Sequence, residues 1–306
     1  MKLERNNTVS QNNLNALKLF FTLIFSICCL AFSPVIAQEQ SESNPPEEYI
    51  YDNVNQLKIY GFRPADFDAN KTYPAIVIFH GGGWSIGEAS WGFGTAQHYA
   101  DLGMVAFSVQ YRLQTDDNDN TPYESVLDAQ TAIRWLRENA DKFSVNPEMI
   151  AAYGWSAGAH IAACAAVFEN LKAPEATVSS SPNLLLLKSP ALSLLLYRNF
   201  QMRLHDNVLV KDISPAEAVD QNMPPSLIVI GRDDTVTPLS GSLLYKDNMA
   251  KHGNECELII YEGVGHLFTP SSEPDDGWPN PDEKVRQDAQ DKMDAFLKMH
   301  QYITKK

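Results

Sequence analysis

The segment that most constrains the fold of this chain is residues 150–160, with the sequence IAAYGWSAGAH. An apolar run ends at Gly154, Ser156 follows, and helix-forming residues resume directly after it. This order predicts a strand, a sharp turn and a helix. Gly154 and Gly158 flank the serine because a Cβ so close to a tight turn would collide with a neighbouring strand or helix. The hydroxyl of Ser156 should therefore lie exposed at a helix N-terminus, where unpaired N–H groups favour negative charge.

Strand and helix patterns alternate along the chain on both sides of this turn. Strand-like apolar runs lie at residues 57–62, 75–79, 104–111, 184–190, 226–231 and 257–261, and helical spacing occurs at 96–102, 126–140, 239–252 and 283–302. Such alternation predicts an α/β fold in which helices cover both faces of a mainly parallel sheet. Ligands of such sheets bind beyond the carboxyl ends of the strands. Residues 196–225 give mixed signals and are compatible with a small cap over that site or a long connection.

The N-terminus has the pattern of an export signal. A polar start leads into an apolar stretch of about 14 residues, and small residues end at Ala37. The stretch is shorter than the roughly 20 residues of a membrane-spanning helix, so we expect cleavage after Ala37 rather than an uncleaved anchor. Residues 38–48 are polar and carry prolines, which predicts a disordered leader. Residues 49–306 then form one large domain, exported to the periplasm or the medium.

Charge and cysteine content narrow the classes of partner. The chain has a net charge of −14, which opposes binding to nucleic acid or to anionic lipid, so we expect neither nucleic acid nor stable membrane association. An oxidising compartment would permit a disulfide between Cys164 and Cys256. Cys164 lies among alanines, as expected of a helix packed tightly on a sheet, and we therefore expect a buried free thiol.

Three predicted strand ends each carry a residue type used in nucleophilic catalysis: Ser156, Asp234 and His266. A serine hydroxyl is a weak nucleophile until an imidazole accepts its proton. A carboxylate on the other ring nitrogen fixes the histidine tautomer and stabilises the imidazolium. Asp233 competes with Asp234 for that position. We expect one of the two to meet the serine and the histidine at the carboxyl edge of the sheet.

The sequence His80-Gly-Gly-Gly-Trp84 follows a predicted strand and is a more specific signal than the serine turn. Consecutive glycines let backbone N–H groups approach a substrate oxygen that side chains would block. We expect the N–H groups of Gly82, Gly83 and Ala157 to stabilise the negative charge that develops on that oxygen. This arrangement is called an oxyanion hole.

With both loops and all three strand ends present, the chain resembles the α/β-hydrolases. It is most similar to their esterase and lipase group, which pairs an HGGGW-type loop with G-x-S-x-G and includes feruloyl and acetyl esterase-like and hormone-sensitive-lipase-like enzymes. The resemblance implies that Ser156 is the nucleophile, His266 the general base and Asp234 the orienting acid. The family phrase places this aspartate three residues after a glycine and four before a proline, as Gly231 and Pro238 stand here.

Other residues near these motifs have two interpretations each. Trp84 and Trp155 adjoin the predicted oxyanion loop and nucleophile, and they either bind substrate by stacking or pack in the core. His80 and His160 are expected to be structural, and no histidine has metal-ligand spacing, so we expect neither metal nor cofactor. Residues 269–282 are rich in Pro and Asp and are expected to form a solvated loop rather than the rim of the site.

The sequence therefore predicts an exported serine carboxylesterase that cleaves small acyl esters, with acetyl or feruloyl esters of carbohydrate as candidate substrates. One alternative is an amide hydrolase, because HGGGW also matches the H-G-G-x-W pattern of arylformamidases and peptidases share the fold. The export signal argues against a cytoplasmic formamidase. A second alternative is a non-catalytic binding module, but such proteins usually lose the triad or the glycine loop, and both are intact here.

Overall fold

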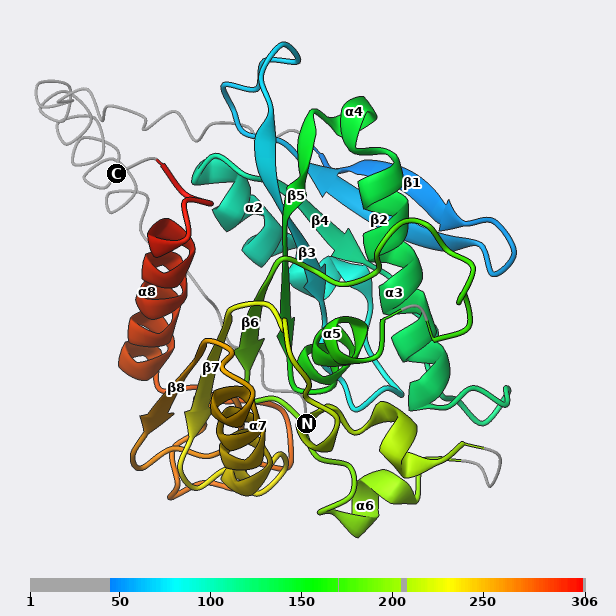
Figure 1. Cartoon of the computed structure of the whole chain (residues 1–306). Coiled ribbons are helices and arrows are strands. Elements are labelled where there is room, and N and C mark those ends of the chain that lie inside the picture. The colour runs from blue at the N-terminus through cyan, green and yellow to red at the C-terminus, as the bar shows by residue number, and fades with distance from the viewer. Residues whose placement is uncertain (1–44, 170, 205–207, 305–306) are drawn as a thin grey trace, which may run out of the picture. The chain divides into compact units, whose positions relative to one another are not determined.

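A mostly parallel eight-stranded sheet forms the centre of residues 45–304 (Figure 1). The computed structural model describes residues 45–169, 171–204 and 208–304, so the predicted export signal and residues 38–44 of the predicted leader lie outside the described residues. The strand order is β1-β2-β4-β3-β5-β6-β7-β8, and only the pairs of β2 with β1 and with β4 are antiparallel. The strands are β1 (Glu47–Asp52), β2 (Leu57–Phe62), β3 (Tyr73–Phe79), β4 (Val105–Val109), β5 (Val145–Trp155), β6 (Leu184–Lys188), β7 (Ser226–Gly231) and β8 (Cys256–Tyr261).

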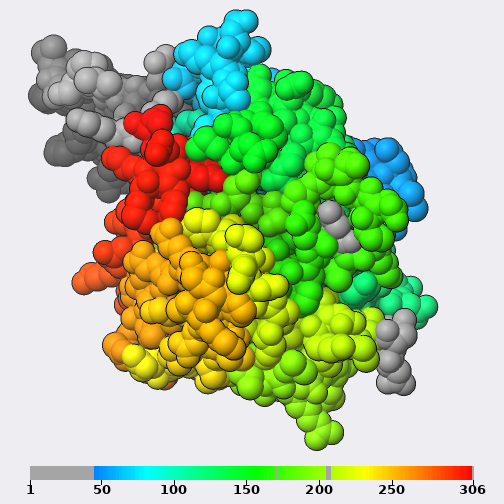
Figure 2. All heavy atoms as spheres, viewed as in Figure 1, coloured from blue at the N-terminus to red at the C-terminus, as the bar shows by residue number. Residues whose placement is uncertain are grey.

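Helices cover both faces of this sheet because successive strand side chains point to opposite sides. The helices are α2 (Phe93–Asp101), α3 (Pro122–Glu138), α4 (Ala140–Phe143), α5 (Ala157–Val167), α6 (Arg198–Gln201), α7 (Leu239–Lys251) and α8 (Glu283–Met299). In β3, Val77 and Phe79 belong to the core beneath α3, α5 and α7, whereas Ile76 and Ile78 belong to the core beneath α2 and α8. On the face shown in Figure 2, the atoms of α3 and α7 and of the neighbouring connections lie over the sheet. The predicted α/β fold is confirmed.

The boundary predicted at residue 49 is wrong, because Glu47 and Glu48 begin β1. An edge strand has a neighbour on one side only, so it can carry polar side chains that face solvent. Here the Glu48 carboxylate lies 2.9 Å from Lys58 Nζ, and the Glu47 carboxylate lies 3.0 Å from Arg63 Nη2. The composition of residues 47 and 48 predicts disorder, but these residues form a strand because β2 supplies backbone hydrogen-bond partners.

The described part of segment 196–225 consists of short helical turns rather than a long amphipathic lid. It contains α6 and two 3₁₀ turns, η2 (Val210–Ile213) and η3 (Pro215–Glu217). Phe200 of α6 packs against Trp84 with ring centroids 5.6 Å apart, and Arg203 Nη1 lies 3.4 Å from Ser85 Oγ. The segment thus covers the glycine loop as a small cap. None of the described helices is both long and apolar enough to cross a bilayer.

Candidate active site

The turn at Ser156 follows the predicted strand, turn and helix. β5 ends at Trp155, α5 begins at Ala157, and Ser156 has φ 54° and ψ −120°, in the left-handed region that side chains rarely occupy. A Cβ at Gly158 would collide with the carbonyl oxygen of Phe79, and one at Gly154 would collide with the backbone of Gly158. The flanking glycines are therefore required by the close contact of α5 with β3 and β5.

Three side chains from separate strand ends form a hydrogen-bonded series. Ser156 Oγ lies 3.0 Å from His266 Nε2, and His266 Nδ1 lies 2.9 Å from Asp234 Oδ2. The three residues are 7%, 6% and 5% exposed, so the series is shielded from water yet opens at one end. With the Nδ1 proton donated to Asp234, Nε2 is left to accept the serine proton. The structure thus brings together the three residues expected at the carboxyl edge of the sheet.

Asp234, and not Asp233, faces the histidine. The Oδ1 atom of Asp234 accepts hydrogen bonds from the backbone N–H groups of Val236 at 3.0 Å and Thr237 at 2.6 Å, which hold the carboxylate in place. The hydroxyl of Thr237 lies 2.9 Å from the other carboxylate oxygen. Asp233 is exposed and instead accepts a hydrogen bond from the Ser271 hydroxyl at 2.6 Å.

Asp275 is a residue of this site that the sequence did not reveal. Its Oδ2 atom accepts hydrogen bonds from the backbone N–H groups of His266 at 2.8 Å and Thr235 at 2.9 Å. It therefore ties the loop that carries the histidine to the loop that carries Asp234. Burial alone would raise the pKa of Asp275, but the hydrogen bonds from Thr235 and His266 lower it, so the carboxylate is charged at neutral pH.

The loop at residues 269–282 is exposed along most of its length, yet it borders the site. Asp275 turns inward, and residues 275–279 line the cavity in front of Ser156. The expectation of a purely solvated loop is therefore wrong. No local pattern marks Asp275, because its partners are the Thr235 hydroxyl and two backbone N–H groups, all in other loops.

The glycine loop turns sharply after β3. Gly82 and Gly83 have φ of +113° and +59°, and a Cβ on Gly82 would collide with the carbonyl oxygen of Ile86. The N–H groups of Ser85 and Ile86 both donate to the Gly82 carbonyl at 3.1 Å. The N–H groups of Gly82 and Gly83 donate to no acceptor among the described residues, and both glycines line the cavity that holds Ser156. The N–H of Ala157 is likewise without an acceptor inside its helix, because it opens α5.

His80 supports this loop from within the core. Its ring stacks on Tyr111 with centroids 4.3 Å apart, and its Nδ1 atom lies 2.7 Å from the Gly81 carbonyl oxygen. Burial lowers the pKa of His80 to about 4, so the ring is neutral and Nδ1–H can donate to Gly81. The expectation that His80 is structural agrees with these contacts.

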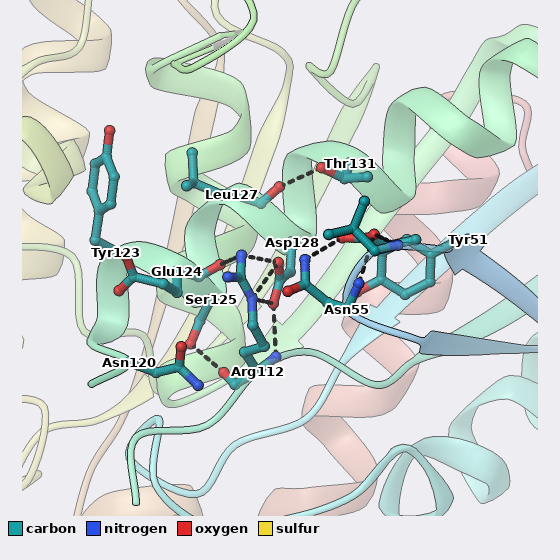
Figure 3. Close-up of polar contacts among 12 residues, drawn as sticks. Tyr51, Asn55, Arg112, Asn120, Tyr123, Glu124, Ser125, Leu127, Asp128 and Thr131 are labelled. Atoms are coloured by element: carbon teal, nitrogen blue, oxygen red, sulfur yellow. Dashed lines mark hydrogen bonds and ion pairs between the residues drawn. The ribbon is translucent and has the colours of Figure 1, made fainter. Parts of the chain in front are cut away.

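A buried ion pair anchors the chain that packs behind the glycine loop. Arg112, just after β4, donates from Nη2 to Asp128 Oδ1 at 2.6 Å and from its backbone N–H to Oδ2 at 2.7 Å (Figure 3). Asp128 lies on α3 and is 1% exposed. Two residues after Arg112, the N–H of Gln114 donates to the Trp84 carbonyl at 2.7 Å. The pair therefore fixes the segment on which the glycine loop rests.

Of Trp84 and Trp155, only Trp155 lines the cavity. Trp84 is 2% exposed, and its Nε1–H donates to His160 Nδ1 at 3.1 Å. The Phe200 ring packs nearly perpendicular to the Trp84 ring, with centroids 5.6 Å apart. Of the two interpretations of Trp84, stacking on substrate is therefore wrong, and core packing agrees with the structure. Burial lowers the pKa of His160 to about 4, so this histidine is a neutral bridge between Trp84 and the carbonyl oxygen of Ile213, 2.7 Å from Nε2.

The cavity in front of Ser156 has a volume of about 440 Å³ and mixed walls. Apolar side chains form most of the wall, and two acidic side chains lie on one side. It is lined by Gly82, Gly83, Ile86, Trp91, Trp155, Ser156, Val236, His266, Leu267, Asp275, Asp276, Gly277, Trp278 and Pro279. The rings of Trp91 and Trp278 meet edge to face at the mouth, 5.6 Å apart, and Trp278 is 77% exposed.

No cluster of metal-binding side chains occurs within the described ranges. Cys164 and Cys256 are both free thiols, and Cys164 is buried. The site offers a hydroxyl beside a histidine base, with backbone N–H donors near both. This arrangement fits acyl transfer to a serine.

Comparison with known proteins gives a consistent result. The BD-FAE family matches residues 62–185. A probable isoprenylcysteine alpha-carbonyl methylesterase of Arabidopsis thaliana is 28% identical over 249 residues, which cover 70% of this chain and 51% of the relative. An acetylxylan esterase of Xylanibacter ruminicola is 28% identical over 211 residues, 65% of this chain and 42% of the relative. The chain thus spans about half the length of the curated relatives it matches.

A solved structure covers more of the chain. The apo form of esterase 2 from Thermogutta terrifontis is 33% identical, with a TM-score of 0.76, and the match covers 87% of this chain and 98% of that one. The similarity therefore extends over the whole of that enzyme.

Proposed function

This chain belongs to the esterase and lipase group of the α/β-hydrolases, and we propose that it is a serine carboxylesterase acting on small acyl esters. The observation that supports this most strongly is the hydrogen-bonded series from Ser156 Oγ through His266 to Asp234, at 3.0 Å and 2.9 Å, opening on a cavity bordered by the glycine loop. A serine that served only to form a turn would not be expected to hydrogen-bond a buried histidine that itself contacts an aspartate from another strand end.

In the proposed mechanism, Ser156 Oγ attacks the ester carbonyl carbon while its proton passes to His266 Nε2. Asp234 stabilises the resulting imidazolium through Nδ1–H. The tetrahedral intermediate collapses when the C–O bond to the alcohol breaks, and His266 gives its proton to the departing oxygen. Water then attacks the acyl-enzyme with the same histidine as base, which releases the acid and restores the serine.

The oxyanion of each tetrahedral intermediate needs fixed donors. We assign this role to the N–H groups of Gly82, Gly83 and Ala157, since the first two line the cavity and the third opens α5. Fixed donors need no reorganisation when charge develops, and the loss of one typically costs about 3 kcal/mol in the transition state. Asp275 acts on the other side of the site, by holding the backbone of His266 in register with Asp234.

The cavity supports a short acyl group and a larger alcohol. Its volume of about 440 Å³ suits a small ester, and structures of the Thermogutta terrifontis enzyme contain propionate and butyrate. The exposed rings of Trp91 and Trp278 at the mouth offer flat apolar faces of the kind that stack on sugar or aromatic rings. We therefore propose acetyl to butyryl esters as the acyl range, with a carbohydrate or aromatic alcohol outside, as in the acetylxylan esterase relative.

We also propose that the protein is exported and cleaved after Ala37. The support is the polar start, the short apolar stretch and the small residues before this position. Expression of the full chain with a C-terminal tag, followed by cell fractionation and N-terminal sequencing, tests this. The expected product begins at Gln38 and is found outside the cytoplasm, whereas an intact chain in the membrane fraction would contradict it.

The activity is tested by initial rates on 4-nitrophenyl esters from acetyl to long acyl chains and on the matching 4-nitroanilides, with Ser156→Ala as the control. We expect the highest rate among the short acyl esters, a fall with chain length, little anilide cleavage and no activity above background in the variant. A folded protein that cleaves anilides but not esters would instead identify an amide hydrolase.

A further inference from the structure

A second, smaller hollow adjoins the cavity in front of Ser156. It has a volume of about 170 Å³ and shares four walls with that cavity: Trp91, Trp155, Leu267 and Pro279. Its remaining walls are Thr95, Tyr153, Lys188 and Pro281. The reaction proposed above uses none of these four. The hollow is therefore a candidate extension of the substrate site with a different chemical character.

Lys188 gives the hollow a positive charge. It is the last residue of β6 and shares a face of the sheet with Leu184 and Leu186, the face covered by α2 and α8. Its side chain is largely buried, and Nζ lies 5.0 Å from the centroid of the Phe268 ring. The ring face offers some attraction to a cation but no counter-charge.

No carboxylate lies within ion-pair distance of Lys188 in the part of the chain that the structure describes. The nearest charges on α8, Arg286 and Glu283, are paired with each other at 2.5 Å. Burial lowers the pKa of Lys188 to about 8, Arg286 adds to this effect, and Glu283 opposes it. A buried cation without a counter-ion destabilises the fold, and an anion brought by a ligand would relieve that cost.

We propose that this hollow binds a carboxylate carried by the ester substrate, with the Lys188 ammonium as its counter-ion. The proposal rests on the esterase function given above and narrows its substrates to esters that carry a carboxylate. Because Trp155 and Leu267 wall both spaces, the hollow adjoins the cavity that would hold the ester at Ser156. The hollow holds one ammonium group, which can neutralise one negative charge, so a ligand with a single carboxylate fits it.

Charge also orients such a substrate. Asp275 and Asp276 line the main cavity but not the hollow, and the chain as a whole has a net charge of −14. These negative charges disfavour a carboxylate beside Asp275 and Asp276, whereas the ammonium of Lys188 attracts it. The neutral ester group then remains at Ser156 while the charged group occupies the hollow.

The carboxylate can belong to the acyl half or to the alcohol half of the ester, and matched substrates distinguish the two. The acyl pair is monomethyl succinate against methyl butyrate, followed by acid release at constant pH. The alcohol pair is 4-acetoxybenzoate against 4-acetoxybenzamide. We expect the protein to prefer the charged member in kcat/KM in one of the two pairs.

The variant Lys188→Met removes the charge and keeps most of the volume. A charge-assisted hydrogen bond is lost, so the preferred charged ester should lose about tenfold in kcat/KM, while its neutral partner changes less than twofold. Lys188→Arg keeps a cation and should retain the preference. Lys292→Met, on the exposed side of α8, removes the same charge elsewhere and should leave both members unchanged.

Two results would overturn the proposal and leave the esterase function standing: a protein that hydrolyses the neutral members faster in both pairs, or a folded Lys188→Met variant with its charge preference intact. The first needs no variant, so it decides even if Lys188→Met fails to fold. A structural role alone predicts equal losses on charged and neutral esters. Absence of Ser156-dependent hydrolysis on all four substrates would overturn both the function and this inference.

Discussion

Two histidine–aspartate pairs in this protein have the same separation and different surroundings. His266 Nδ1 lies 2.9 Å from Asp234, and His98 Nε2 lies 2.9 Å from Asp294. The side chains of the first pair are 7% and 0% exposed, and those of the second are 37% and 24% exposed. The second pair joins α2 to α8 at the surface, where water screens the interaction.

The difference shows that distance alone does not mark a functional pair. Around Asp234, two backbone N–H groups and a threonine hydroxyl hold the carboxylate, and Asp275 holds the backbone of His266. Ser156 then lies within reach of the free ring nitrogen. The His98 pair lines neither the cavity in front of Ser156 nor the hollow at Lys188. A fixed and shielded pair can perform proton transfer, whereas a screened pair contributes only to stability.

Breaking the buried pair should give the largest effect. Asp234→Asn leaves the shape intact but favours the wrong histidine tautomer, so kcat should fall by roughly 10⁴-fold with little change in KM. Steady-state kinetics on 4-nitrophenyl acetate measures this. The matched control is Asp233→Asn, which should change kcat less than threefold because Asp233 bonds only Ser271. A larger loss for Asp233→Asn would reverse the assignment.

The Arg112–Asp128 ion pair resembles the His266–Asp234 pair in its buried carboxylate but contacts no catalytic residue. Asp128→Asn leaves the guanidinium of Arg112 without a counter-charge, which should lower the free energy of unfolding by about 3 kcal/mol. Urea denaturation measures the change, with Glu138→Gln on the exposed side of α3 as the control. An unchanged free energy of unfolding would show that water fully solvates the guanidinium charge of Arg112 once its partner is removed.

Asp275→Asn tests whether anchoring the histidine backbone matters. We expect kcat to fall about ten- to a hundredfold, since small misplacements of a catalytic group are costly. Steady-state kinetics on 4-nitrophenyl acetate measures the change. Asp276→Asn, an exposed neighbour, serves as the control. An unchanged kcat in folded Asp275→Asn would show that the His266 backbone needs no charged acceptor at this position.

Breaking the exposed pair should give the smallest effect. The contact with Asp294 raises the pKa of His98, although burial opposes it. A raised pKa in the folded state stabilises the protein below the unfolded pKa of about 6.5, and this contribution disappears as pH rises through the folded pKa. Asp294→Asn should therefore cost at most about 0.5 kcal/mol at pH 5.5 and nothing at pH 9, with kcat unchanged. Chemical denaturation at the two pH values checks this.

Much of the site could be predicted because each functional residue lies in a short sequence motif at the end of a strand. Ser156, Asp234 and His266 each follow a strand in the same parallel sheet, so topology alone brings them to one edge. The glycines at 82 and 158 stand where a Cβ meets backbone, and only glycine satisfies that requirement. These features depend on chain direction and backbone sterics, which a sequence pattern records directly.

The parts that could not be predicted depend on contacts between distant segments. Asp275 acts through backbone N–H groups of two other loops, and Trp84 is buried because Phe200 and His160 enclose it. Lys188 ends an apolar strand, and its missing counter-ion is visible only once α8 is in place. Side-chain exposure and pairing of this kind follow from the assembled fold.

The central claim is that Ser156 is the nucleophile activated by His266, and a covalent label tests it most directly. The purified protein is treated with diethyl 4-nitrophenyl phosphate, and aliquots are assayed for esterase activity and digested for peptide mass spectrometry. We predict one diethylphosphoryl group per chain, on Ser156, with activity falling in proportion to labelling and no label in the His266→Ala variant. Loss of activity with Ser156 unmodified, or full modification of Ser156 with activity retained, would contradict the claim.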